Sequence, residues 1–278
     1  MLTKATAASD AHIFAANRAR GRIALAVASR AGRTHRTRVH EDGSLRVRFP
    51  NAEADALEAV IVNTGGGMTG GDRFEIDIAL DTGASLVAGT AAAEKIYRST
   101  GADAEMDVRL SVGANARLCW LPQEAILFDR ARLKRRIDIA LAESATLLLA
   151  EAVVFGRTAM GEAMEQGLFV DRWRLHRGGR LVFADSTRLD GAVAEKLAAP
   201  ASAAGGIAIA TVLIAPGDDT TTSTVRELEP QFAGEVGISA WNGIALARLC
   251  ATDGAALRHD LILMLAALKS PVPRLWLQ

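Results

Sequence analysis

The sequence has little cysteine, few aromatic residues and no excess of charge of either sign. Only Cys119 and Cys250 occur among the 278 residues, so the chain encodes no disulfide framework and no CxxC site. The 32 Lys and Arg residues balance 32 Asp and Glu residues, whereas proteins that grip nucleic acid usually carry a basic excess. We therefore expect no nucleic-acid partner. Cys119, in the apolar run 118–121, is interpreted as a small buried hydrophobe.

Long hydrophobic runs are also missing. The longest, 207–215 and 261–268, are too short to span a bilayer, so we expect no membrane partner. The first thirty residues mix Arg with Ala and lack the continuous apolar stretch of a secretory signal. These features predict a soluble protein of a reducing compartment, the cytoplasm. The arginine-rich start leaves a matrix-type targeting peptide open.

Charge is unevenly distributed along the chain. Residues 1–50 hold ten Lys and Arg residues against three acidic ones. Such a segment can dock on an acidic partner, but a solvated, arginine-rich strand face is the favoured interpretation. No low-complexity linker divides the sequence, so we predict a single domain over residues 1–278 that includes this basic segment.

A strand-turn-strand unit is the clearest pattern present. In residues 73–81, Phe74, Ile76, Ile78 and Leu80 alternate with polar residues and so share one face of a strand. A Thr-Gly-Ala turn follows, and then a second apolar run begins. Alone, such a unit would expose its apolar face to water.

The unit recurs three more times. Equivalent positions fall at 77, 107, 138 and 172, in steps of 30, 31 and 34 residues. A nearly fixed period of this size is typical of stacked arrays, in which each unit buries the apolar face of its neighbour. We therefore predict a mainly β fold, a β-helical, solenoid-like stack with a few short helices. An ordinary antiparallel sandwich with evenly spaced hairpins is the alternative.

Helix signals are few. Residues 192–204 predict a short helix before Pro200, and residues 254–268 predict a helix near the C-terminus that ends before Pro271. The tail, 270–277, is rich in proline and is expected to be extended.

A glycine-rich segment, 63–72, follows an apolar run. Gly65, Gly67 and Gly70 match the GxGxxG pattern of dinucleotide-binding folds, but that pattern must open a helix, and a period-2 strand follows here. A P-loop would need lysine where Asp72 stands. The glycines are therefore interpreted as a tight turn with positive φ angles.

Sequence motifs for catalysis or stable metal binding are missing. No GxSxG elbow occurs, and no two of the histidines have zincin spacing: His12, His35, His40, His176 and His259. We expect no catalytic residue, no stable metal site and no tightly bound cofactor. A β-helical carbohydrate-active enzyme is the alternative function, by fold analogy alone. The low aromatic content, 5%, weighs against it.

Five segments in order along the chain resemble the UreD (UreH) family of urease accessory proteins. Residues 63–72 are similar to that family's N-x-x-G-G-(L/M/V)-x-x-G-D, 90–99 to its T-Q-A-A-T-K-(V/I)-Y-R-S, and 121–129 to its L-P-(Q/H)-E-x-I-x-F. Residues 155–162 and 273–276 resemble its G-R-x-x-x-G-E and C-terminal P-R-x-W.

The resemblance implies a β-helical fold and a non-catalytic role. Members of this family bind UreF and, through it, the GTPase UreG, in a hetero-oligomer assembled on apo-urease, so that nickel in transit can enter the urease active site. Ala91 and Glu94 depart from the Gln and Thr that are usual in the family, which puts any contact made by those side chains in doubt here.

The motifs supply the candidate residues for partner contacts. They are Gly66, Gly67, Gly71, Lys95, Tyr97, Arg98, Ser99, Pro122, Gln123, Glu124, Arg157, Arg274 and Trp276. Tyr and Arg are enriched at protein interfaces, although 95–98 can equally be a plain strand. Trp276 and the C-terminal helix can dock on UreF or close the stack.

Asp72 and Glu162 are the candidate carboxylates of a transient nickel path through the stack. Oxygen ligands suit nickel less than imidazole or thiolate does, so such a path would bind the ion weakly and release it. Each residue also has a structural interpretation. Asp72 can cap the turn through backbone N–H groups, and Glu162 can pair with Arg157.

Overall fold

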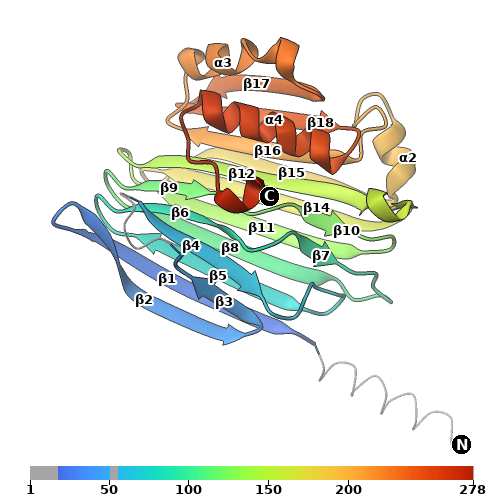
Figure 1. Ribbon diagram of the computed structural model, residues 1–278, viewed down its shortest axis with the longest axis horizontal. Helices are drawn as coiled ribbons and strands as arrows, with labels where there is room; N and C mark the ends of the chain where they lie inside the picture. Colours follow the sequence, from blue (N-terminus) through green and yellow to red (C-terminus); the bar gives the residue numbers. More distant parts are fainter. Residues whose placement is uncertain (1–17, 51–55, 278) are drawn as a thin grey trace, which may run out of the picture.

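Two β-sheets stacked face to face make up most of the protein (Figure 1). The computed structural model describes residues 18–50 and 56–277, and within these ranges the first sheet, sheet A, has seven strands. In spatial order they are β15 (Arg180–Ala192), β14 (Gln166–Arg177), β11 (Arg132–Leu141), β8 (Ala104–Val112), β5 (Arg73–Leu80), β1 (Arg20–Arg30) and β2 (Arg33–Gly43).

The second sheet, sheet B, has eleven strands among the described residues. Its main path runs β17 (Glu235–Trp241), β18 (Ile244–Ala251), β16 (Ala208–Ala215), β12 (Thr146–Arg157), β9 (Arg117–Trp120), β6 (Ser85–Thr90), β4 (Leu57–Asn63) and β3 (Leu45–Arg48). Three short strands lie beside this path: β7 (Glu94–Ile96), β10 (Ala125–Leu127) and β13 (Glu162–Ala163).

The chain winds as a solenoid. Each turn adds one strand to each sheet, and β1, β5, β8, β11 and β14 pair in parallel, as do β4, β6, β9 and β12. The colours in Figure 1 therefore run in chain order from one end of the stack to the other. The predicted β-solenoid is confirmed, and the antiparallel sandwich is wrong for these central strands.

The predicted register of the repeat was off by two residues. Asp77 pairs with Arg109 instead of Asp107, Arg109 pairs with Asp138, and Asp138 pairs with Arg174. A shift of two residues leaves every side chain on its own face of the sheet, so hydrophobic alternation cannot detect it.

The core lies between the sheets and follows the predicted alternation. Phe74, Ile76, Ile78 and Leu80 of β5 all point inward and are buried, as expected from the sequence. Equivalent apolar positions of each turn stack above them, so the repeat unit buries its apolar face only when its neighbours are in place.

Antiparallel strands close the stack at its two ends. At one end β1 and β2 form a hairpin whose second strand is exposed along almost its whole length. This confirms the solvated, arginine-rich strand face for β2, while docking of the basic segment on an acidic partner stays a prediction. Residues 1–17 of that segment lie outside the described residues. At the other end β16, β18 and β17 extend sheet B beyond β15.

Helices cover the outer face of this extension. Helices α3 (Asp219–Arg226) and α4 (Gly254–Ala267) lie there, and a second apolar cluster packs between α4 and sheet B (Figure 1). Cys119 is buried in this cluster, as predicted. None of the helices in the described part of the chain is both long and apolar enough to cross a membrane.

Both predicted helices are present. The C-terminal helix is confirmed as α4, and the short helix expected before Pro200 is confirmed as α2 (Val193–Ala198). The tail is not wholly extended, since a 3₁₀ helix, η3 (Arg274–Leu277), follows Pro273, and proline fits the start of a helical turn. Two further 3₁₀ turns are η1 (Thr158–Met160) and η2 (Glu229–Gln231).

Helix α3 was missed from the sequence. Its signal is the segment 218–221, where the Asp218 side chain accepts from the Thr221 N–H and the Thr221 hydroxyl faces back to the Asp218 N–H. This reciprocal capping box satisfies two backbone donors at the helix start and explains why a threonine-rich, mostly polar segment is helical.

Candidate functional site

Four of the sequence motifs meet along one edge of the stack. The glycine-rich segment hydrogen-bonds to the segment of the second motif that contains β7. Met68 N donates to Lys95 O and Tyr97 N donates to Met68 O, each at 2.7 Å. Strand β7 then pairs in parallel with β10, and β10 with β12. Segments far apart in the sequence thus form successive layers.

Side chains from three of these layers stack on one another. The Tyr97 ring meets Phe128 edge-on, with 4.9 Å between centroids, and the Arg157 guanidinium lies 4.2 Å above the Phe128 ring centroid. Arg157 pairs with Glu162, which also accepts from the Asp129 N–H. We call Tyr97, Phe128, Arg157 and Glu162 the motif stack.

The glycine-rich segment needs its glycines at the contact with Tyr97. Gly66, Gly67 and Gly71 have φ angles of 75°, 146° and 91°, which confirms the predicted turn with positive φ. A Cβ on Gly67 would lie 2.5 Å from the Tyr97 ring and 2.6 Å from the Lys95 carbonyl oxygen. The Tyr97 hydroxyl also donates to Gly66 O at 3.0 Å.

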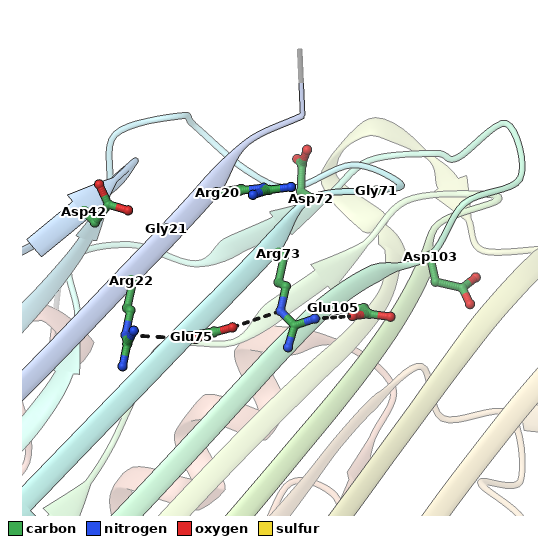
Figure 2. Close-up of a pocket in the computed structure, with 10 residues that line it drawn as sticks. All are labelled: Arg20, Gly21, Arg22, Asp42, Gly71, Asp72, Arg73, Glu75, Asp103 and Glu105. Carbon is green, nitrogen blue, oxygen red and sulfur yellow. Dashed lines mark hydrogen bonds and ion pairs between the residues drawn. The ribbon is translucent and has the colours of Figure 1, made fainter. Parts of the chain in front are cut away.

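Asp72 is buried at the rim of a groove of about 560 Å³ on sheet A (Figure 2). Its two carboxylate oxygens accept from Ala19 N and Thr69 N, each at 2.8 Å. The turn cap and the Arg157–Glu162 pair, which the sequence offered as structural roles, are thus both present. The role of Asp72 and Glu162 in nickel transfer stays a prediction.

The third motif holds α4 against the stack. Arg258 of α4 donates to both carboxylate oxygens of Glu124, at 2.7 and 2.9 Å. Gln123 in turn fixes the loop before β7, because its N–H donates to Thr90 Oγ1 at 2.9 Å and its Nε2 to Ala91 O at 3.0 Å. These two candidate residues therefore connect the motif edge to the C-terminal helix.

A buried ionic cluster lies between the two sheets, and the sequence analysis missed it. Arg135 of β11 donates Nε and Nη2 to Asp171 of β14, at 3.0 and 2.6 Å, and also binds Glu151 of β12. Trp120 Nε1 donates to Glu151 Oε1 at 2.7 Å. We call Arg135, Glu151 and Asp171 the interior cluster.

Two carboxylates and one guanidinium give the interior cluster a net charge of −1 when all three are ionised. Burial raises the pKa of Glu151, even though Arg135 and the Trp120 N–H oppose the shift. The cluster thus has one more carboxylate than Arg135 can neutralise, and burial in a region from which water is largely excluded disfavours the extra negative charge.

A sequence signal for this cluster exists. Arg135 occupies an inward position of β11, between Leu133 and Ile137, where alternation calls for an apolar residue. Glu151 likewise interrupts the apolar run 147–155. A charged residue at an inward position must be paired, and this identifies it as a candidate for a buried site.

An open groove adjoins the interior cluster at the end of the stack. It has a volume of about 690 Å³ and lies where sheet B extends past β15, with Leu189, Ile209 and Cys250 among its lining residues. Two further lining residues are cross-strand neighbours of the cluster, since Thr187 pairs with Asp171 and Thr211 with Glu151. The groove therefore lies beside the strands that carry the cluster carboxylates, although Glu151 and Asp171 are not among its lining residues.

Comparison with known proteins agrees with the motifs. A family model described as "UreD urease accessory protein" matches residues 19–277. The chain belongs to the UreD family. A urease accessory protein UreD of Bradyrhizobium diazoefficiens is 60% identical over 265 residues, covering 95% of this chain and 96% of the relative.

Other UreD proteins match over similar lengths. "Urease accessory protein UreD 3" of a Bradyrhizobium species is 57% identical, covering 98% of each chain. A UreD protein of Rhodopseudomonas palustris is also 57% identical, covering 98% of this chain and 95% of its own length. The resemblance predicted from five motifs is confirmed, and nothing in these matches supports a carbohydrate-active enzyme.

Glu94, which stands where the UreD motif usually has Thr, joins the glycine-rich segment to β7. Asn63 Nδ2 donates to Glu94 Oε1 at 2.8 Å and to Gly67 O at 3.1 Å. Desolvation by burial raises the pKa of Glu94 to about 7, and the hydrogen bond from Asn63 only partly offsets the shift. This UreD chain therefore carries a carboxyl that titrates near neutrality at its motif edge.

The remaining UreD motif residues differ in exposure. Lys95, Tyr97, Arg98 and Arg274 are exposed and lie where a partner can touch them. Pro122 and Trp276 are buried, so they can shape such a surface only from beneath, and Ser99 bonds within its own loop to Gly101 and Ala102. Within residues 18–50 and 56–277, no group of three or more His, Cys, Asp or Glu side chains could hold a metal ion.

Proposed function

We propose that this chain is a non-catalytic scaffold of urease maturation in the cytoplasm. It binds apo-urease together with UreF and the GTPase UreG, and it assists the GTP-dependent insertion of nickel into the urease active site. The observation that carries this proposal is the family match over residues 19–277, together with relatives at 57–60% identity along nearly the whole chain.

The motif stack is the proposed partner surface. Tyr97 is exposed although its ring packs on Phe128, and Lys95 and Arg98 beside it are exposed as well. A rigidly held aromatic ring flanked by cations is the type of anchor that contributes most to protein interfaces. The glycine-rich segment supports this surface through its backbone, which adopts positive φ angles and contributes no bulky side chains at the contact.

Nickel is cargo in this proposal, and the interior cluster is its passing point. A dication that enters the end groove is attracted by the two carboxyl groups of Glu151 and Asp171, which outnumber the single guanidinium of Arg135, and its charge favours the ionised form of Glu151. Two carboxylates bind nickel less tightly than histidine or cysteine ligands do, so the ion can leave again. Asp72 and Glu162 remain the candidates predicted from the sequence, and they belong in the same test.

The test of the scaffold role is a deletion of this gene from a complete urease operon, followed by restoration. We expect assembled but nickel-poor, inactive urease after deletion, with nickel content and activity recovered on restoration. A tagged copy should also recover UreF, UreG and urease subunits in defined ratios. Urease that loads nickel normally without the chain would overturn the proposal.

A further inference from the structure

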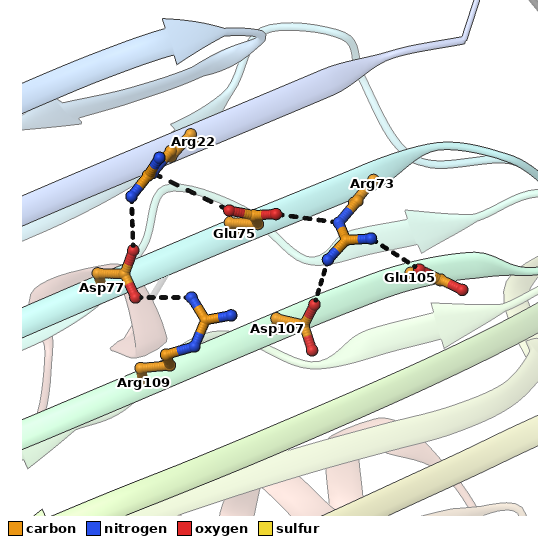
Figure 3. A network of polar contacts seen from close by, with 7 residues as sticks. All are labelled: Arg22, Arg73, Glu75, Asp77, Glu105, Asp107 and Arg109. Carbon is orange, nitrogen blue, oxygen red and sulfur yellow. Dashed lines mark hydrogen bonds and ion pairs between the residues drawn. The ribbon is translucent and has the colours of Figure 1, made fainter.

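The outer face of sheet A is divided by charge. Over β1, β5 and β8 three arginines meet carboxylates. Arg22 lies 4.0 Å from Glu75 and 3.5 Å from Asp77, and Arg109 lies 2.9 Å from Asp77 (Figure 3). Arg73 bridges three carboxylates in the same network. The three arginines and the four carboxylates of this network pair with one another, so the network is close to neutral.

Over β11, β14 and β15 the same face is basic. A groove of about 510 Å³ opens there and extends over the neighbouring strands β8 and β5, where it shares Arg73, Glu105 and Asp107 with the paired network. Its acidic lining residues are Glu105, Asp107 and Asp138. We call this groove the basic groove, because its outward-facing basic residues outnumber the three acidic ones. The basic residues are Arg73, Lys134, Arg136, Arg172, Arg174 and Arg188.

Two arginines of the basic groove are unpaired. Arg172 and Arg174 are exposed, and among the described residues neither has an ion pair or a side-chain hydrogen bond. In register, Arg172 lies between Arg136 and Ser186, so no carboxylate faces it. Arg174 faces Asp138, but that carboxylate is held by Arg136 at 2.8 Å.

We propose that the basic groove docks an extended, carboxylate-rich segment of a partner protein. The two free guanidinium groups project from positions i and i+2 of one strand, about 6.7 Å apart along it. An extended segment repeats its side chains at the same spacing, so acidic residues at alternate positions can meet both arginines. Each arginine–carboxylate pair can form two parallel hydrogen bonds.

The lining favours a protein segment over a phosphate polymer. Glu105, Asp107 and Asp138 stand among the basic residues and would repel a uniformly charged polyanion. A protein segment can present carboxylates to the arginines and neutral or basic side chains to these acids. The formal net charge of the whole chain is zero, so no long-range basic field attracts nucleic acid. The assignment of this partner to a urease maturation complex rests on the proposed function.

The experiment measures binding of a labelled synthetic peptide in which Glu alternates with Thr, by fluorescence anisotropy with the full-length chain. Arg172→Glu/Arg174→Glu should raise the Kd at least about tenfold, because two attractive pairs become repulsive. Arg172→Lys/Arg174→Lys, which keeps the charge, should raise the Kd only about threefold. The matched control is Arg117→Glu, a charge reversal at an exposed strand position of sheet B.

Three results would overturn the inference. They are unchanged peptide binding in the Arg172→Glu/Arg174→Glu variant with an unaltered melting temperature, equal weakening by Arg117→Glu, and tighter groove-dependent binding of inorganic polyphosphate than of the peptide. The operon deletion separates this test from that of the proposed function. If urease loads nickel without the chain while the peptide still depends on Arg172 and Arg174, the proposed function fails and the docking groove stands.

Discussion

Two arrays of arginine and carboxylate occupy opposite faces of sheet A, and they differ in burial far more than in geometry. In the interior cluster Arg135 is 3% exposed, whereas Arg73 in the outer network is 50% exposed. The pair distances are similar, 2.6 Å for Arg135 to Asp171 and 3.0 Å for Arg73 to Glu75. Distance alone therefore does not reveal which array the fold depends on.

The energetic difference comes from solvent. An exposed pair contributes at most about 1 kcal/mol, because water and salt screen both charges. Removal of one partner from a buried pair costs about 3–5 kcal/mol, since the remaining charge has no solvent to stabilise it. The alternation of β11 places Arg135 inside and its neighbours Lys134 and Arg136 outside. Adjacent residues of one strand therefore belong to the buried and the exposed array.

The largest expected effect is that of Arg135→Met, which leaves Glu151 and Asp171 buried without their cation. We predict a loss of about 3–5 kcal/mol in the free energy of unfolding at neutral pH, measured by urea denaturation. The loss should shrink as the pH falls, because protonation removes the uncompensated charge. A loss below about 1 kcal/mol would show that the buried and exposed arrays are energetically alike, contrary to the comparison.

An intermediate effect is expected at Glu94, a largely buried carboxyl that has Asn63 but no arginine as its hydrogen-bond partner. Its pKa of about 7 in the folded protein lies above its ordinary value of 4.5. Ionisation is thus disfavoured in the folded state. The stability linked to this group is complete below pH 4.5 and is lost as the pH rises through 7.

Glu94→Gln should remove this pH dependence. Relative to the variant, the wild-type chain should lose up to about 3 kcal/mol between these two pH values, measured as urea midpoints across the range. Parallel pH profiles for the two proteins would show that Glu94 ionises freely in the folded state.

The smallest effect is expected for Arg73→Met in the outer network. Each of its three pairs is half exposed on the arginine side, so we predict a loss of at most about 1 kcal/mol. Added salt should reduce the difference further, because exposed pairs are screened within about 10 Å at 0.1 M. If the loss matched that of Arg135→Met, burial would not be what distinguishes the arrays.

The sequence predicted the solenoid because its signal is a repeat, and a repeat remains visible when individual elements are ambiguous. It could not set the register, since a shift of two residues keeps Asp77 and its neighbours on the same face. The sequence also revealed the motifs that form the edge. It could not reveal the stacking of Tyr97, Phe128 and Arg157, because these side chains meet only through contacts between successive turns of the solenoid.

The interior cluster was missed for a different reason. Metal and catalytic motifs have recognised spacings along one segment, whereas Arg135, Glu151 and Asp171 come from three separate strands. All three side chains occupy inward-facing positions of their strands, and these positions can be recognised only after the strands are assigned. Helix α3 was missed because its polar sequence hides a capped helix start at Asp218.

The proposed passage of nickel past the interior carboxylates is tested most directly by the nickel content of urease that matures in cells carrying variants of this chain. Glu151→Gln keeps the side-chain shape and an acceptor for Trp120 but removes the surplus charge. Asp77→Asn in the outer network is the matched control, and Asp72→Asn and Glu162→Gln test the sequence-based candidates. Co-purification of the variant chain with urease monitors assembly. For Glu151→Gln we predict assembled urease that contains less than about half the wild-type nickel, which corresponds to a free-energy loss greater than RT ln 2 at the nickel-loading step. For Asp77→Asn we predict the wild-type nickel content. Full nickel content with Glu151→Gln would contradict the account.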